Sequence, residues 1–185
     1  YNKEFFDEAM RKILEKYIRE TISDHQLARF LLNDIIRYYR TTCVDFEQKT
    51  AEARKPWGTR NIKLVFPRKL IYFSGVLAVA ETYRCTAKEK VEKLLALLAL
   101  SPVERIIDIC GSKALPALAL YDFFLEEFSK ETVRDECDST TETNRHDQPT
   151  FRLLKNSGHE FSEKLRSLLN GTYDPGHPIH HALLF

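Results

Sequence analysis

The chain of 185 residues carries 28 basic and 27 acidic side chains, a formal net charge of +1, and 43% hydrophobic residues. These proportions are typical of a globular domain and argue against a disordered chain. A net charge near zero excludes attraction of the whole molecule to nucleic acid or to a membrane surface, so any such attraction requires a local patch. We expect one soluble, cytoplasmic domain that occupies residues 1–185.

The cysteine spacing and the apolar runs exclude two further classes of protein. Cys43, Cys85, Cys110 and Cys137 contain no C-x-x-C pair, so we expect free thiols and no structural zinc site. No apolar run approaches the roughly 18 residues that a membrane span requires, so we expect no membrane partner.

Apolar residues recur at helical spacing along most of the chain, and no segment reads as a convincing strand. The predicted helices cover about residues 3–20, 24–50, 60–84, 87–100, 102–110, 116–132 and 149–170. The predicted fold class is therefore all-α, a bundle of about six or seven helices with a long second helix.

Local signals mark where several of these helices begin, bend or end. Capping residues predict helix starts after Ser23, Thr86 and Ser101, each followed three residues later by glutamine or glutamate. Pro67 predicts a kink in the third helix, because proline removes a helical hydrogen bond. Gly171 predicts the end of the last helix.

Two segments lack helical periodicity. Residues 138–148 contain no apolar side chain, which predicts a polar loop or a disordered stretch. The tail from Tyr173 to Phe185 contains two prolines and three histidines before it ends in Ala-Leu-Leu-Phe. We expect those four apolar residues to dock on the body of the domain.

The long second helix has an unusual distribution of polarity. At 100° per residue, its polar side chains form one narrow stripe: Asp34, Arg37, Thr41, Asp45 and Gln48. Apolar residues cover most of the rest, whereas an ordinary surface helix has a wide polar face. Because a lone buried charge is costly, the stripe either pairs internally, as Asp34 with Arg37 and Asp45 with Lys49, or faces a cleft.

The segment that follows is basic throughout. Between residues 54 and 80 the chain has six basic side chains and no acidic one. Arginine forks, an asparagine and a nearby tyrosine ring suit a nucleotide or another phosphate-bearing ligand. We therefore predict ligand contacts at Asp34, Arg37, Arg60, Asn61, Lys63, Arg68 and Tyr72. The alternative is a solvated basic face, with Trp57 as an apolar plug at the junction of the second and third helices.

Two blocks, LLNDIIRYYRTTCVDFEQKT (31–50) and KPWGTRNIKLVFPRKLIYFSGV (55–76), carry a family resemblance, together with the ending TYDPGHPIHHALLF. They resemble the helical C-terminal region of bacterial proteins whose N-terminal domain is a nucleotidyltransferase of the DNA polymerase β type. The resemblance implies an accessory helical domain that packs beside a catalytic domain and helps to hold nucleotide or acceptor. Since the sequence starts at Tyr1 without a methionine, we expect a C-terminal part of a longer protein.

The chain departs from the catalytic pattern of that superfamily. Its Gly111-Ser112 pair is followed by Asp122, which belongs to no Asp-x-Asp pair and lies in a predicted helix. We therefore expect no catalytic residue, metal ion or cofactor in this chain. Mg²⁺ and a nucleotide would bind chiefly to the nucleotidyltransferase domain that the resemblance implies as a partner.

Two other functions remain open from the sequence. The helical faces would suit a non-catalytic interaction module that binds a partner protein or forms a homodimer. Arg19 and His25 have the Arg-x(4–6)-His spacing of helical ribonucleases of the HEPN class. His159 and Glu163 sit one helical turn apart, but a metal site needs three or four ligands, so we expect none there.

Overall fold

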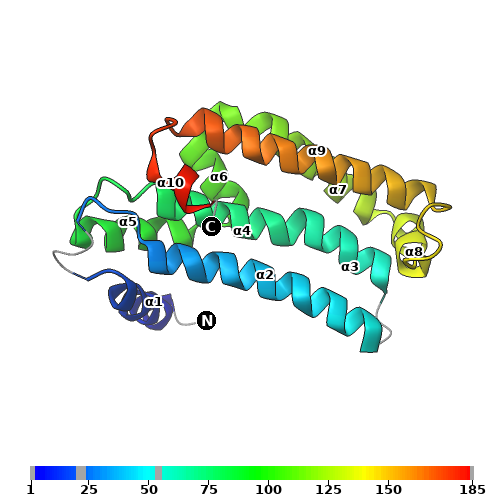
Figure 1. The fold of residues 1–185 in the computed structure, drawn as a ribbon, viewed down its shortest axis with the longest axis horizontal. Coiled ribbons are helices and arrows are strands. Elements are labelled where there is room, and N and C mark those ends of the chain that lie inside the picture. The colour runs from blue at the N-terminus through cyan, green and yellow to red at the C-terminus, as the bar shows by residue number, and fades with distance from the viewer. Residues whose placement is uncertain (1–2, 20–23, 53–55, 184–185) are drawn as a thin grey trace.

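The computed structural model describes residues 3–19, 24–52 and 56–183, and every regular element within these ranges is helical. This confirms the all-α prediction (Figure 1). The α-helices are α1 (Lys3–Tyr17), α2 (Arg29–Glu52), α3 (Trp57–Lys63), α4 (Lys69–Ala80), α5 (Ala87–Ala99), α6 (Pro102–Cys110), α7 (Leu115–Ser129), α8 (Glu131–Ser139), α9 (Pro149–Thr172) and α10 (Pro178–Ala182). A π-helical turn over Leu64–Arg68 joins α3 to α4, and a 3₁₀ turn over Gly111–Ala114 joins α6 to α7.

Helix α4 forms the axis of the bundle. Nine of its twelve residues are buried, from Leu70 to Ala80, because the helix is apolar on nearly every side. Helices α2, α5 and α6 pack against it, and α9 packs against α3, the π turn and α7 (Figure 1). A smaller core lies between α1 and α5, around Leu14 and Leu94.

A buried arginine fastens three helices together. Arg105 of α6 is only 7% exposed and donates to the carbonyls of Leu97 (2.7 Å) and Leu100 (2.9 Å) at the end of α5. It also donates to the hydroxyl of Ser74 in α4, at 3.0 Å. The guanidinium thus satisfies carbonyls that a helix end leaves without an intrahelical partner, and its positive charge suits that end of the helix dipole.

The capping predictions at α5 and α6 are confirmed. Thr86 and Glu89 form a reciprocal capping box at the start of α5, and Ser101 and Glu104 form another at α6. Each glutamate accepts from the backbone N–H of its partner, at 2.8 Å for Thr86 and 2.9 Å for Ser101. These hydrogen bonds hold the pKa of both glutamates below the ordinary value.

The predicted start of the second helix is wrong by about five residues. Helix α2 begins at Arg29, and Ser23 lies outside the described residues. The segment before Arg29 is instead held against α5: Asp24 accepts from the backbone N–H of Ala87 at 2.5 Å, and the ammonium of Lys90 donates to the carbonyl of Gln26. Tertiary hydrogen bonds therefore override the local helix signal.

The third predicted helix is one continuous helical rod with an irregular turn at its proline. Pro67 lies within the π-helical turn, and the backbone on both sides of it, at Lys63 and Lys69, stays in the helical region. The rod begins at Trp57, directly after Pro56, and ends at Ala80, four residues before the predicted end. The side chain of Trp57 packs between Phe46 and Phe151, which fits the apolar plug.

The C-terminal third contains two helices more than predicted, α8 and α10. The chain is extended at Lys130, so the helix expected over 116–132 ends at Ser129, and α8 follows. The polar loop therefore starts at Thr140, two residues later than expected. Helix α9 runs through Gly171 to Thr172, so Gly171 does not end it. In the tail, Ile179 is fully buried and Leu183 packs on the core; residues 184–185 lie outside the described ranges.

A carboxylate closes the polar loop at its base. Glu136 of α8 accepts from the backbone N–H groups of Thr150 (2.7 Å) and Phe151 (3.1 Å), in the first turn of α9, and from the Thr150 hydroxyl (2.6 Å). A negative charge at a helix N-terminus satisfies unpaired N–H groups and suits the helix dipole. The end of α8 and the start of α9 are therefore clamped to each other.

Gly158 sets how closely α9 approaches the π turn. A Cβ atom at this position would lie 2.3 Å from Cγ1 of Val65 and 3.3 Å from Cε2 of Phe66. Phe66 is itself fully buried, and its ring stacks between Phe124 and Phe161 at 4.5 and 5.3 Å between ring centroids. Only a residue without a side chain allows α9 to lie this close to α3 and α4.

We predict that Gly158→Ala destabilises the fold by about 1–3 kcal/mol, because overpacking outweighs the helix-propensity gain of about 1 kcal/mol. Gly171→Ala is the matched control in the same helix, since a Cβ there meets no atom within 4 Å. Chemical denaturation of both variants measures the difference. Equal or greater stability of Gly158→Ala would show that Val65 moves aside freely.

Candidate functional site

Two lysines lie along the contact between α9 and the rod formed by α3 and α4. The ammonium of Lys155 donates to Oδ1 of Asn61, and the ammonium of Lys69 donates to Oγ of Ser162, both at 2.6 Å. Positions 155 and 162 are two turns apart on one face of α9, with Gly158 between them. We call the line formed by Asn61, Lys69, Lys155 and Ser162 the α9 seam.

A pocket of about 290 Å³ opens at one end of the α9 seam, where α3, α9 and the loop before α9 meet. We call it the Lys155 pocket; its lining residues are Trp57, Asn61, Arg145, His146, Phe151, Arg152, Lys155 and Asn156. Three of these side chains are cations and none is a carboxylate. The lining also contains two rings whose centroids are 5.4 Å apart, those of Trp57 and Phe151.

The loop and the helix bring the two arginines of the pocket to the same histidine. Nε of Arg145 donates to Nε2 of His146 at 3.3 Å, and Nη1 of Arg152 donates to the His146 carbonyl at 3.4 Å. Neither arginine has a carboxylate partner among the described residues. Most of their hydrogen-bond donors are therefore available to an anion.

The surroundings of the α9 seam disfavour the charged forms of its two lysines. Burial lowers the pKa of Lys155, and the positive charges of Lys69 and then Arg145 lower it further. Burial likewise lowers the pKa of Lys69, which only the thiol of Cys43 raises. Within the described part of the chain, no carboxylate offsets either shift. An arrangement of half-buried cations that repel one another is what a polyanionic ligand would relieve.

Arg68 adds a third cation beside Lys69. Its Nη1 atom is buried and has no hydrogen-bond partner among the described residues. Both Arg68 and Lys69 act electrostatically on Cys43 of α2, although burial still raises the pKa of that thiol overall. An unpaired buried donor costs about 1–3 kcal/mol, so this nitrogen would gain from an acceptor.

The structure places the predicted ligand residues in several different surroundings. Asn61 lines the Lys155 pocket, and Arg68 lies near Lys69 at the other end of the seam. Asp34 and Arg37 line a separate pocket between α1 and α2 and pair with each other at 3.4 Å, as the alternative reading expected. Asp34 also accepts from the hydroxyl of Tyr17, at 2.7 Å.

The remaining predicted residues are engaged with protein groups. Nη2 of Arg60 donates to the backbone carbonyl (3.2 Å) and carboxylate (3.5 Å) of Asp45, although its buried Nη1 has no partner among the described residues. The Lys63 ammonium lies over the ring of Phe128, 5.8 Å from its centroid, and the ring of Tyr72 stacks on Tyr39 at 4.7 Å.

The basic residues that matter most to the pocket lie outside the predicted set. Lys155, Arg145 and Arg152 come from the loop and helix near the C-terminus, and 94 residues separate Lys155 from Asn61. One sequence signal was present: Lys155 directly follows Leu154, which is fully buried in the core-facing row of α9. A lysine next to such a row is half-buried, which is uncommon for a surface charge.

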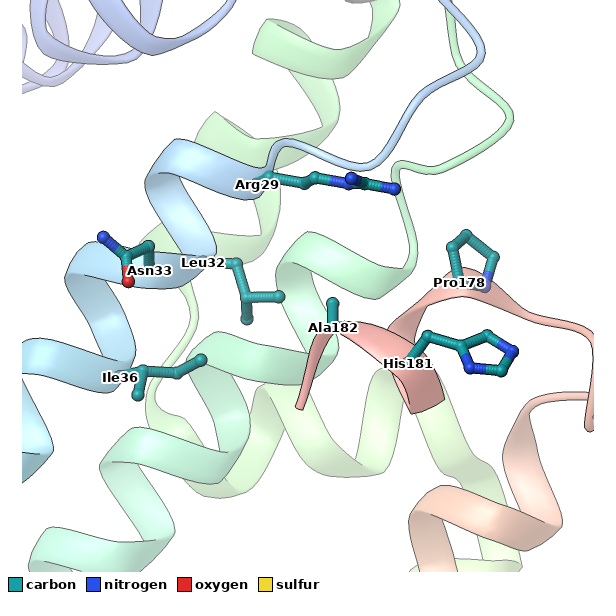
Figure 2. A pocket seen from close by; sticks show the side chains of 7 residues that line it. All are labelled: Arg29, Leu32, Asn33, Ile36, Pro178, His181 and Ala182. Atoms are coloured by element: carbon teal, nitrogen blue, oxygen red, sulfur yellow. The ribbon is translucent and has the colours of Figure 1, made fainter. Parts of the chain in front are cut away.

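A larger pocket of about 480 Å³ lies between α2 and α10 and has a different chemistry. Figure 2 shows Leu32 and Ile36 directed toward Ala182, with the Arg29 side chain extended across toward Pro178. Arg29 and His181 are exposed at its rim, and most of its other lining residues are apolar. None of the predicted ligand residues lines it.

The described residues, 3–19, 24–52 and 56–183, show neither a metal-binding cluster nor a membrane-spanning helix. No group of three or more His, Cys, Asp or Glu side chains in these ranges could hold a metal ion together. None of their helices combines the length and the apolar composition that crossing a membrane requires. The four cysteines are free thiols, of which Cys110 and Cys137 are buried.

We predict that Lys155→Met stabilises the protein at pH 7 because it removes a half-buried charge and keeps the apolar stem. A lysine whose folded pKa is lowered makes the natural chain gain stability as pH rises from that lowered pKa toward about 10.4, where the unfolded lysine titrates. The advantage of the variant should therefore shrink across this alkaline range. Thermal unfolding from pH 7 to 10.5 measures both effects. A less stable variant at pH 7 would mean that the bond to Asn61 outweighs burial and repulsion.

Comparison of the chain with protein-family models, with curated proteins and with solved structures found no match.

Proposed function

We propose that the chain is an accessory helical domain of a nucleotidyltransferase-like protein and that it holds a phosphate-bearing ligand, nucleotide or acceptor, in the Lys155 pocket. The supporting observation is the half-buried ammonium of Lys155. It donates to the neutral amide oxygen of Asn61, the positive charges of Lys69 and Arg145 lower its pKa, and no carboxylate among the described residues lines the pocket. Of the ligand contacts predicted from sequence, the proposal keeps Asn61 in the pocket, and it adds Arg145, Arg152 and Lys155 from the loop and helix near the C-terminus.

Each part of the pocket has a role in such binding. Lys155 supplies a desolvated point charge, and the planar guanidiniums of Arg145 and Arg152 supply pairs of N–H donors for phosphate oxygens. The amide of Asn61 already contacts Lys155 and can accept from or donate to a ligand as well. The partly exposed ring of Trp57 offers a flat apolar surface for a base or sugar.

This proposal assigns binding to the chain and no catalytic step. The Gly111-Ser112 pair forms part of a 3₁₀ turn, and Asp122 is exposed on α7. Magnesium chemistry would belong to the nucleotidyltransferase domain that we propose as a partner.

Titration of the 185-residue chain with AMP and with inorganic phosphate tests the proposal, followed by amide chemical shifts in NMR. We expect shifts at Asn61 and Lys155, and a loss of affinity of about tenfold or more in Lys155→Met, since a hydrogen bond to a charged group contributes about 1.5–3 kcal/mol. Arg29→Gln, in the pocket of Figure 2, is the control and should bind normally. Absence of shifts with both probes, or equal loss in the control, would contradict the proposal.

A second candidate function is self-association through the outer face of α2. Phe30, Tyr38 and Val44 are 77%, 58% and 65% exposed, which is unusual for large apolar side chains on one helix. Phe30 and Val44 are fourteen residues apart and therefore lie on the same stripe of the helix. Such a stripe favours an interaction module, either as an alternative to ligand binding or alongside it.

Light scattering after size exclusion tests the second candidate. We expect a dimer for the natural chain and a monomer for the double variant Phe30→Ser, Val44→Ser. Leu115→Ser is the matched control, because Leu115 is also 65% exposed but lies on α7. A natural chain that stays monomeric at high concentration would exclude this function.

The ribonuclease hypothesis stays a prediction. His25 is exposed, and its Nδ1 is 2.8 Å from the carbonyl of Arg84. Residues 20–23, between Arg19 and His25, lie outside the described ranges.

A further inference from the structure

We infer that the site takes a ligand with two linked phosphate groups, one held at the Lys155 pocket and the other by Lys69 and Arg68. The inference rests on the proposed function and goes beyond it, because it names a diphosphate as the recognised group. It also makes Lys69 and Arg68 ligand contacts although they lie outside the lining of the Lys155 pocket.

Lys69 brings a second cation to the face of α9 that carries Lys155. Its bond to Ser162 holds its ammonium at position 162 of α9, and the backbone of this position lies two helical turns, about 10 Å along the helix axis, from the backbone of Lys155. Both lysine side chains are long and flexible, and the charge of Lys69 is felt at Lys155. The two ammonium groups therefore lie in one electrostatic field and can both reach a ligand that spans the gap.

A ligand can replace the present hydrogen-bond partners of Lys69 and Lys155. Lys69 donates to a neutral hydroxyl, and Lys155 donates to a neutral amide. A bond from an ammonium to an ionised phosphate oxygen also pairs opposite charges, which a neutral hydroxyl or amide oxygen cannot do. A phosphate oxygen at either place would replace a weak partner with a strong one.

Arg68, which precedes Lys69 in the chain, has an unpaired hydrogen-bond donor. Its buried Nη1 lacks a partner among the described residues, and the guanidinium acts on the same cysteine as Lys69. Lys69 and Arg68 therefore both lie close enough to Cys43 to influence it, and Nη1 of Arg68 lacks an acceptor in the described part of the chain. A second phosphate at this point would satisfy the nitrogen and offset both charges, whereas a single phosphate in the Lys155 pocket would leave them unchanged.

The number of cations around the site indicates how much negative charge its ligand carries. Five cations contribute to the pocket and the seam: Arg68, Lys69, Arg145, Arg152 and Lys155. One phosphate carries at most about two negative charges near neutral pH. A diphosphate carries more charge in a compact group and therefore matches this concentration of cations better.

Calorimetric titration of the 185-residue chain with inorganic phosphate and with pyrophosphate, at one fixed ionic strength, tests the inference. Citrate serves as a multiply charged anion without a phosphoanhydride. We expect pyrophosphate to bind at least about tenfold more tightly than phosphate, and citrate to bind no better than phosphate. If citrate matches pyrophosphate, the preference reflects charge alone and the inference fails.

Variants locate the second phosphate. In Lys69→Met, we expect the affinity for pyrophosphate to fall to the level of phosphate, while phosphate binding changes by less than about threefold. Ser162→Ala removes the present partner of Lys69 but keeps its charge, so the preference for pyrophosphate should remain or increase. If circular dichroism shows that Lys69→Met does not fold, Arg68→Gln takes its place with the same expectation.

The outcomes separate this inference from the proposed function. If neither phosphate nor pyrophosphate binds, the proposed function fails and the inference falls with it. If phosphate binds and depends on Lys155, but pyrophosphate shows no preference or keeps it in both Lys69→Met and Arg68→Gln, only the inference is overturned.

Discussion

The contact between Gly158 and the π turn is the constraint on which the site depends. Without a side chain at this position, α9 can lie directly against Val65 and Phe66, and this approach sets the distance between α9 and the α3–α4 rod. The Asn61–Lys155 and Lys69–Ser162 hydrogen bonds lie on either side of that point. A wider separation between α9 and the rod would weaken both hydrogen bonds. It would also expose the two lysines to water, and the lowering of their pKa by burial would be lost.

The same packing explains why the chain tolerates charges that repel one another. The buried rings of Phe66, Phe124 and Phe161 and the apolar axis formed by α4 provide the stabilising burial. Arg105 and the two capping boxes satisfy the ends of α5 and α6. Against this background, a few half-buried cations reduce the stability of the fold without preventing folding, which is typical of binding sites.

The fold was largely predictable from sequence, but most of the site was not. Periodicity, the capping boxes at Thr86 and Ser101 and the irregularity at Pro67 are encoded within a few residues each, so local reading finds them. The start of α2 was missed because Asp24 is held by Ala87, 63 residues away. The basic segment predicted Asn61 and Arg68 as ligand contacts. It could not predict Lys155, because only the packing of α9 against α3 brings Lys155 to Asn61.

Helix α2 also shows that a local sequence pattern does not identify contacts with other helices. From the sequence, its narrow polar stripe could either form ion pairs within the helix or face a cleft. The structure shows both an ion pair within the helix and a pocket along this stripe. Asp34 and Arg37 pair, yet they line a pocket against α1. Asp45 engages Arg60 in the next helix, a partner that the sequence spacing did not suggest. Helical spacing restricts which residues share a face, and it gives no information about which other helix faces them.

The clamp formed by Glu136 separates the loop that carries Arg145 and His146 from the body of the bundle. Because the carboxylate joins the end of α8 to the first turn of α9, residues 140–148 leave and return at fixed points. Changes in the length or composition of this loop would then alter one wall of the pocket while the helices keep their positions. Selection could thus redirect ligand preference through a short, structurally independent segment, with little effect on folding.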